Sequence, residues 1–109
     1  MLAKKYRFPI QSTQGMRGHT FPFPGFSVKV FPTSLPYARF GVILKKGIVK
    51  KASDRTRLRR IFFNALRSID APKIVSRRDM LFIANAAAPD IVPEDLAGSI
   101  AAAVRSAAR

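Results

Sequence analysis

The chain contains no cysteine and no tryptophan, and its one histidine is His19. Without cysteine it forms no disulfide, binds no zinc through thiolates and offers no thiol nucleophile. With one histidine it supports no mechanism that needs two imidazole groups. No apolar run approaches the roughly 20 residues that span a bilayer, and no apolar stretch of a secretory signal follows the basic N-terminus. These absences exclude many enzyme classes and lead us to expect a cytoplasmic protein.

Acidic residues are also few: 6 Asp and Glu stand against 20 Lys and Arg, for a net charge of +14. A compact surface with so much charge of one sign repels itself, and a polyanion such as nucleic acid relieves that repulsion. The acids are scattered, and Asp54, Glu94 and Asp95 lie at expected helix starts. We therefore expect no catalytic residue and no metal ligand, in a single domain over residues 1–109 that binds a polyanion.

The first half of the chain predicts strands. A short helix is expected over 10–14, and 21–24, with two prolines, is expected to be extended but unable to donate a continuous strand ladder. Strict alternation of apolar residues predicts strands over 26–31 and 39–44. Because the prolines between them are typical of a turn, these two strands are predicted to form an antiparallel hairpin.

The second half predicts two helices around a buried strand. Between 55 and 69 the apolar residues recur at helical spacing, with Ser53 or Asp54 as the expected N-cap and Pro72 ending the helix. This stripe comprises Leu58, Ile61, Phe62, Ala65, Leu66 and Ile69. The continuous apolar run 80–84 predicts a central strand that is buried on both faces. A last helix is expected from Pro93, with Leu96, Ile100 and Val104 facing the core.

Basic residues concentrate between 39 and 60, where only Asp54 opposes them. Nine lie in this window: Arg39, Lys45, Lys46, Lys50, Lys51, Arg55, Arg57, Arg59 and Arg60. Solvated helix faces usually mix charges of both signs, and this one does not. Arginine binds phosphate through two parallel hydrogen bonds, and a helix N-terminus adds backbone N–H donors. The window therefore predicts a nucleic-acid interface.

Residues 50–60, Lys-Lys-Ala-Ser-Asp-Arg-Thr-Arg-Leu-Arg-Arg, resemble the signature of the bacterial ribonuclease P protein component, in which a lysine-rich loop runs into an Arg-Asn-Arg helix. The segments 1–7, 39–42 and 78–84 resemble that family's start, the strand before its signature and the strand after it. The resemblance extends over nearly the whole chain, including its length and basicity.

The resemblance implies a small two-layer α+β sandwich of the ribosomal protein S5 domain 2-like type. Its mostly antiparallel sheet would have about four strands, in the order α-β-β-β-α-β-α, with a left-handed βαβ crossover. The implied function is that of the protein subunit of ribonuclease P, an endoribonuclease that removes the 5′ leader of precursor tRNA. The family's chemistry lies in the catalytic RNA and its bound Mg²⁺, and no membrane or obligate protein partner is implied.

The resemblance also assigns residues. Those implied to bind the catalytic RNA are Lys45, Lys46, Lys50, Lys51, Arg55, Thr56, Arg57, Arg59 and Arg60. Thr56 stands where the family has asparagine, so the two-sided amide pairing is absent there. Ser12 and Thr13 stand near the phenylalanine that the family offers to the leader. The candidates for leader binding are instead Tyr6, Phe8, Lys29, Phe31 and Arg39.

Several alternatives stay open at this point. The same basic residues suit a structural RNA-binding protein, such as a ribosomal one, or a protein that lies on an anionic membrane surface. Phe21 and Phe23 either stack on unpaired bases or close one edge of the core. His19 is either a phosphate donor or a loop residue without a role.

Overall fold

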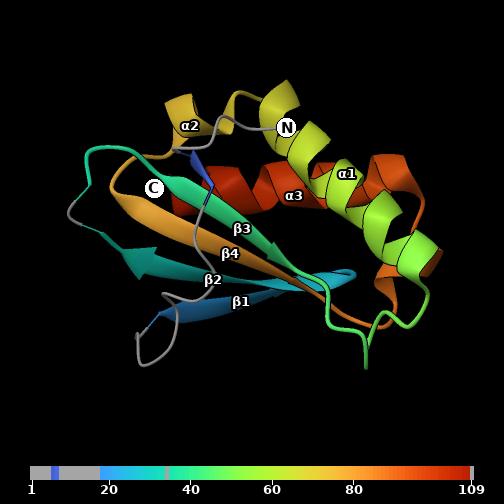
Figure 1. Ribbon diagram of the computed structural model, residues 1–109. Helices are drawn as coiled ribbons and strands as arrows, with labels where there is room; N and C mark the ends of the chain where they lie inside the picture. The colour runs from blue at the N-terminus through green and yellow to red at the C-terminus, as the bar shows by residue number, and fades with distance from the viewer. Residues whose placement is uncertain (1–5, 8–17, 34, 109) are drawn as a thin grey trace.

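The computed structural model describes residues 6–7, 18–33 and 35–108. Within them lie β1 (His19–Phe23), β2 (Phe26–Pro32), β3 (Arg39–Ile43), α1 (Ala52–Ser68), α2 (Ala71–Ile74), β4 (Arg78–Ala84), a 3₁₀ turn η3 (Ala88–Asp90) and α3 (Pro93–Ala107). This confirms the small α+β fold, the strands and the two long helices that were predicted (Figure 1). The helix expected over 10–14 lies outside the described residues.

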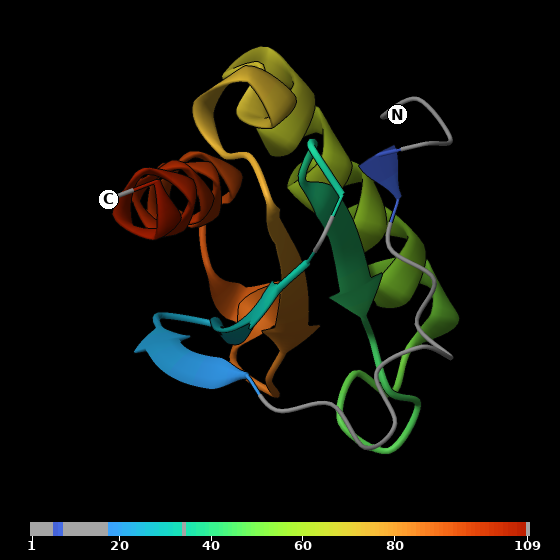
Figure 2. The same cartoon turned by 90° about the vertical axis from the view of Figure 1, so that its left-hand side faces the viewer.

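The four strands form one mixed sheet in the order β1-β2-β4-β3. β2 pairs antiparallel with both β1 and β4, whereas β3 pairs parallel with β4. The predicted hairpin between β2 and β3 is therefore wrong, because β4 lies between them (Figure 2). β4 is the most continuously apolar strand. It lies inside the sheet because a strand there has both of its faces covered.

The alternation in the strands assigns the two faces of the sheet as predicted. Phe26, Val28 and Phe40 face α1 and α3 and belong to the main core. Phe31 and Leu81 form a smaller cluster on the second face, which points away from these helices. β4 contributes buried residues to both clusters, so it is the buried central strand that its apolar run predicts.

The predicted stripe of α1 packs on the sheet. Leu58, Phe62 and Leu66 are fully buried, and the Phe62 ring lies 5.5 Å from Phe26 and 5.7 Å from Phe82, centroid to centroid. Since its own sheet covers this stripe, the apolar face of α1 is not available to a membrane surface. Among the described residues, no helix has the length and apolar character to cross a bilayer.

α1 begins earlier than predicted. Its N-cap is Lys51, whose side chain makes no capping hydrogen bond. The expectation that Ser53 or Asp54 caps the helix is therefore wrong, because both residues already lie inside it. Asp54 still stabilises the first turn through its charge, which lies at the positive end of the helix dipole.

β1 is an edge strand that ends in a tight turn. Phe23 and Phe26 are opposite each other across Pro24 and Gly25, and Gly25 has φ +85°, as a type II turn requires at this position. One residue back from this closing pair, Pro22 lies opposite Ser27. Pairs that exchange hydrogen bonds alternate with pairs that do not, so Pro22 lies where no ladder hydrogen bond is needed. Residues 21–23 thus belong to a paired strand. This agrees with the expectation of an extended segment that cannot donate a continuous ladder, because Pro22 has no N–H to donate.

Candidate nucleic-acid interface

The predicted basic residues gather at one end of the molecule, where the loop after β3 leads into α1 (Figure 1). We call this surface the cationic ridge; it comprises Lys45, Lys46, Lys50, Lys51, Arg55, Arg57, Arg59 and Arg60, with Thr56 among them. Buried Val49 anchors the loop, and its N–H donates to the carbonyl oxygen of Lys45 at 2.8 Å. Because the loop is held from inside, all four of its lysines are exposed to solvent.

Two arginines of the ridge also hold the protein together. Arg55 Nη1 donates to the carbonyl oxygens of Val49 at 2.8 Å and of Lys50 at 2.9 Å, which joins α1 to the lysine loop. Arg57 Nη2 donates to the carbonyl oxygen of Pro89 at 3.0 Å, which joins α1 to η3. These arginines keep their charge at the surface while their position is fixed, so the ridge is organised before any ligand arrives.

Arg59 and Arg60 differ from that pair, because both are exposed and, among the described residues, make no ion pair. They line a shallow hollow on α1 together with Thr56, Phe63 and Asn64. The Thr56 hydroxyl donates to the carbonyl oxygen of Ala52 at 3.1 Å, which leaves its oxygen lone pairs available as acceptors.

The sequence reasoning missed two residues of this hollow. Asn64 is exposed and stands one helical turn after Arg60, so it adds an amide to the charged group. Phe63 is buried although it lies off the predicted stripe. The signal for Asn64 was its spacing of four residues from Arg60, which puts two side chains on one helix face.

The leader candidates lie in different environments on the second face of the sheet. Lys29 is exposed on β2. Phe31 is 2% exposed, packs beside Leu81 and has Gly18 against its ring, so no base can stack on it in this conformation. In this conformation Phe31 therefore offers no aromatic platform, and its part in leader binding stays a prediction. Tyr6 is partly buried, with its ring edge-on to Tyr37 at 5.7 Å, and Phe8 lies outside the described residues.

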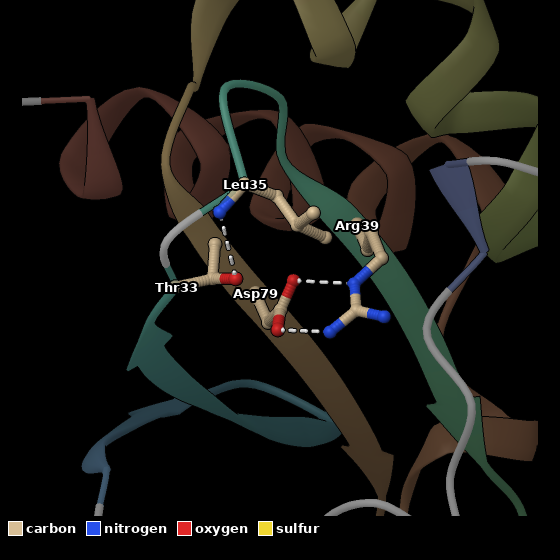
Figure 3. A network of polar contacts seen from close by, with 4 residues as sticks. All are labelled: Thr33, Leu35, Arg39 and Asp79. Atoms are coloured by element: carbon tan, nitrogen blue, oxygen red, sulfur yellow. Dashed lines mark hydrogen bonds and ion pairs between the residues drawn. The ribbon is translucent and has the colours of Figure 1, made fainter.

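Arg39 is paired with a buried carboxylate on that face (Figure 3). Its Nε and Nη2 donate to the two oxygens of Asp79 at 3.0 and 2.7 Å, across the parallel pair of β3 and β4. The hydrogen bonds to Asp79 raise the pKa of Arg39, against a smaller opposing effect of burial. Asp79 thus neutralises much of the charge that Arg39 was predicted to offer an RNA leader.

Within the part of the chain that the structure describes, no three His, Cys, Asp or Glu side chains converge as a metal site would need. Three of the acids are instead beside cations: Asp79 with Arg39, Asp54 with Arg57 and Asp70 with Lys73.

Comparison with known proteins gives the same fold. The family model described as Ribonuclease P matches residues 5–108. Among solved structures, the chain is similar to a mutant RNase P protein from Staphylococcus aureus described as defective in mRNA degradation activity, with 20% identity, a TM-score of 0.83, and coverage of 95% of this chain and 89% of that one. It is also similar to the RNase P protein from Thermotoga maritima, with 16% identity, a TM-score of 0.79, and coverage of 92% and 96%. No curated protein sequence matches the chain.

Proposed function

Because the chain belongs to the ribonuclease P protein family, which has a role in tRNA processing, we propose that it binds the catalytic RNA of ribonuclease P through the cationic ridge and assists removal of the 5′ leader from precursor tRNA. The observation that carries this proposal is the ridge itself, a surface with eight basic residues at one end of the fold. The family match favours this function over that of a structural ribosomal protein.

The ridge binds RNA through two kinds of group. Arg55 and Arg57, whose guanidinium groups are held by backbone carbonyls, set the position of the phosphates. Arg59 and Arg60 are exposed and supply bidentate hydrogen bonds to phosphate oxygens. The first turn of α1, which no side chain caps, adds backbone N–H donors and the positive end of the helix dipole. Each phosphate that the ridge neutralises releases about one counterion.

The second face of the sheet receives the leader in this proposal. Lys29 is an exposed cation there, and Arg39 stands at the other side of the same face with part of its charge offset by Asp79. With Phe31 buried, we propose that contacts to the leader are mainly to its phosphates rather than by stacking. Such contacts carry little sequence information, as befits leaders of varied sequence.

We propose that the cleavage chemistry and its Mg²⁺ ions belong to the RNA. The chain's own part is electrostatic: it brings cationic side chains between two polyanions, which lowers their mutual repulsion. Repulsion between RNA strands otherwise has to be offset by free divalent ions. The protein is therefore expected to matter most where magnesium is scarce.

Reconstitution tests the proposal. Catalytic RNA and precursor tRNA are mixed at limiting Mg²⁺ in three arms: RNA alone, protein alone and both together. We expect leader removal to be fast only in the combined arm and absent with protein alone. Binding of the RNA without any stimulation would support a structural role instead, and turnover by the protein alone would move the chemistry into this chain.

A further inference from the structure

The helix layer does not cover the whole sheet. Figure 2 shows β1 at the edge of the sheet, below the C-terminal end of α3. His19, Phe21 and Phe23 of β1 line a hollow against Ala103 and Ala107 of α3. Phe21 is 48% exposed, although it lies on the helix-facing side opposite buried Val28. An apolar surface is therefore open between the edge strand and the last helix.

This hollow continues into a second one that is cationic. The two share His19, Val30 and Arg78, and the second adds Ser76 and Arg77. We call the pair the β1 groove. Among the described residues, no Asp or Glu side chain lines either part of it. The groove thus has aromatic rings at one end and two arginines at the other.

The two arginines are held in different ways. Arg78 Nη1 donates to the carbonyl oxygen of Ala107, which keeps its guanidinium at the C-terminal end of α3. Arg77 is exposed and has φ +59°, a left-handed conformation that favours glycine or asparagine. The backbone there is fixed by the hydrogen bond from the N–H of Thr33 to the Arg77 carbonyl oxygen at 3.2 Å. A charged side chain is thus held at a position where its backbone conformation is unfavourable.

We propose that the β1 groove binds an unpaired stretch of RNA, with a base against Phe21 and the adjoining phosphate at Arg77 and Arg78. This goes beyond the proposed function, because the start of β4, where Arg77 and Arg78 lie, is at the opposite end of the molecule from the start of α1 (Figure 1). A phenylalanine ring stacks on any base, and only an unpaired base exposes its flat face to a groove. Arginines supply the phosphate contacts.

Charge complementarity favours RNA over the other occupants of an apolar groove. A second copy of this chain would bring another +14 charge against Arg77 and Arg78. An apolar peptide would bring no anion to the exposed guanidinium group of Arg77. A nucleotide has both an apolar base and an anionic phosphate. The base would lie at the aromatic end of the groove and the phosphate at the end with the two arginines.

Photocrosslinking tests the inference. The probe is a single-stranded RNA of ten nucleotides with one central 4-thiouridine, mixed at low salt with the full chain carrying Arg59→Ala and Arg60→Ala to weaken the ridge. Trypsin cleaves after Arg17 and Lys29, so His19, Phe21 and Phe23 share one peptide, 18–29. We expect mass spectrometry to find the crosslink in this peptide.

Matched variants separate the groove from general charge and apolarity. Phe21→Ser is expected to lower the crosslink yield about tenfold, whereas Val92→Ser, which alters another exposed apolar residue, is expected to leave it unchanged. Arg77→Asn, which suits the left-handed backbone, is expected to weaken binding severalfold, and Arg67→Gln is not. Melting temperatures are measured for all four variants.

Crosslinks confined to other peptides, or an equal loss in the control variants, would overturn the inference. So would a dimer in sedimentation that Phe21→Ser dissociates, since a second copy would then occupy the groove. The proposed function is tested separately, by the reconstitution assay. If the wild-type chain failed to stimulate leader removal there, the proposed function would be contradicted, while a crosslink in peptide 18–29 would still support the β1 groove.

Discussion

Replacing Arg59 and Arg60 together by alanine is the sharpest way to separate RNA binding from folding. Both side chains are exposed and, among the described residues, neither makes an ion pair. If each contacts one phosphate, the slope of log K against log salt becomes less steep by about 0.7–0.9 per arginine. The loss of two charge-assisted contacts at an exposed surface is expected to weaken RNA binding by about 2–3 kcal/mol, or roughly 30- to 150-fold.

The free energy of unfolding is expected to change little when Arg59 and Arg60 are replaced, and more when Arg57, which holds α1 to η3, is replaced. The Arg59 and Arg60 double variant changes the free energy of unfolding by less than about 0.5 kcal/mol. Arg57→Ala removes the hydrogen bond to the Pro89 carbonyl oxygen and is expected to cost about 1 kcal/mol, which lowers the melting temperature by about 4–8 °C.

The assay is a titration of labelled catalytic RNA at several salt concentrations, with thermal melting of each variant alongside. The matched control is Arg67→Ala with Lys73→Ala, which removes two exposed charges outside the ridge. A double variant at Arg59 and Arg60 that keeps the wild-type salt slope would refute the reasoning. An equal loss of affinity in the control would show that total charge, and not the ridge, holds the RNA.

Three further substitutions test how the fold supports the ridge, each followed by thermal or denaturant unfolding. Phe62→Ala empties the contact with Phe26 and is expected to cost about 3–5 kcal/mol; a negligible shift would mean that α1 does not pack as described. Arg39→Met is expected to destabilise by about 3–5 kcal/mol, and more than Asp79→Asn, because it leaves a carboxylate that is 1% exposed without a counter-charge; the reverse order would contradict this. Gly25→Ala is expected to destabilise by at least about 1 kcal/mol, because a Cβ at φ +85° would lie 2.5 Å from the side chain of Ile91; an unchanged melting temperature would contradict the turn geometry.

Local pattern predicted most of the elements, because each depends on neighbours in the sequence. The stripe of α1, the alternation in β2 and the apolar run of β4 each identify both an element and its buried face. The basic cluster was equally visible, since charges that are close in sequence on a loop and a helix start are also close in space. The finer RNA contacts of those residues stay predictions.

Strand pairing was beyond local pattern. The prolines between β2 and β3 are compatible with a hairpin and equally with a chain that leaves room for another strand. The choice between these two arrangements depends on β4, about forty residues later. Because both faces of β4 are apolar, it is buried at the centre of the sheet, between β2 and β3. A pairing that is decided by a distant segment cannot be recognised from the turn alone.

The hydrogen-bond partners of individual side chains could not be predicted from the sequence either. Arg55 and Arg57 look like Arg59 and Arg60 in the sequence, yet within the described part of the chain only the first two donate to backbone carbonyls. Those acceptors come from the folded loop and from η3, which no motif marks. Arg39 is similar: its partner Asp79 lies forty positions away and becomes adjacent only through the parallel register of β3 and β4.

The most direct measurement of the central claim is the Mg²⁺ concentration at which leader removal by the catalytic RNA reaches half its maximal rate. With the wild-type chain this midpoint is expected to fall well below that of the RNA alone, because cations of the ridge replace part of the divalent ions. The Arg59→Ala and Arg60→Ala variant is expected to lose much of that shift, and the Arg67→Ala and Lys73→Ala control to keep it. A midpoint that is the same with and without the protein would contradict the claim.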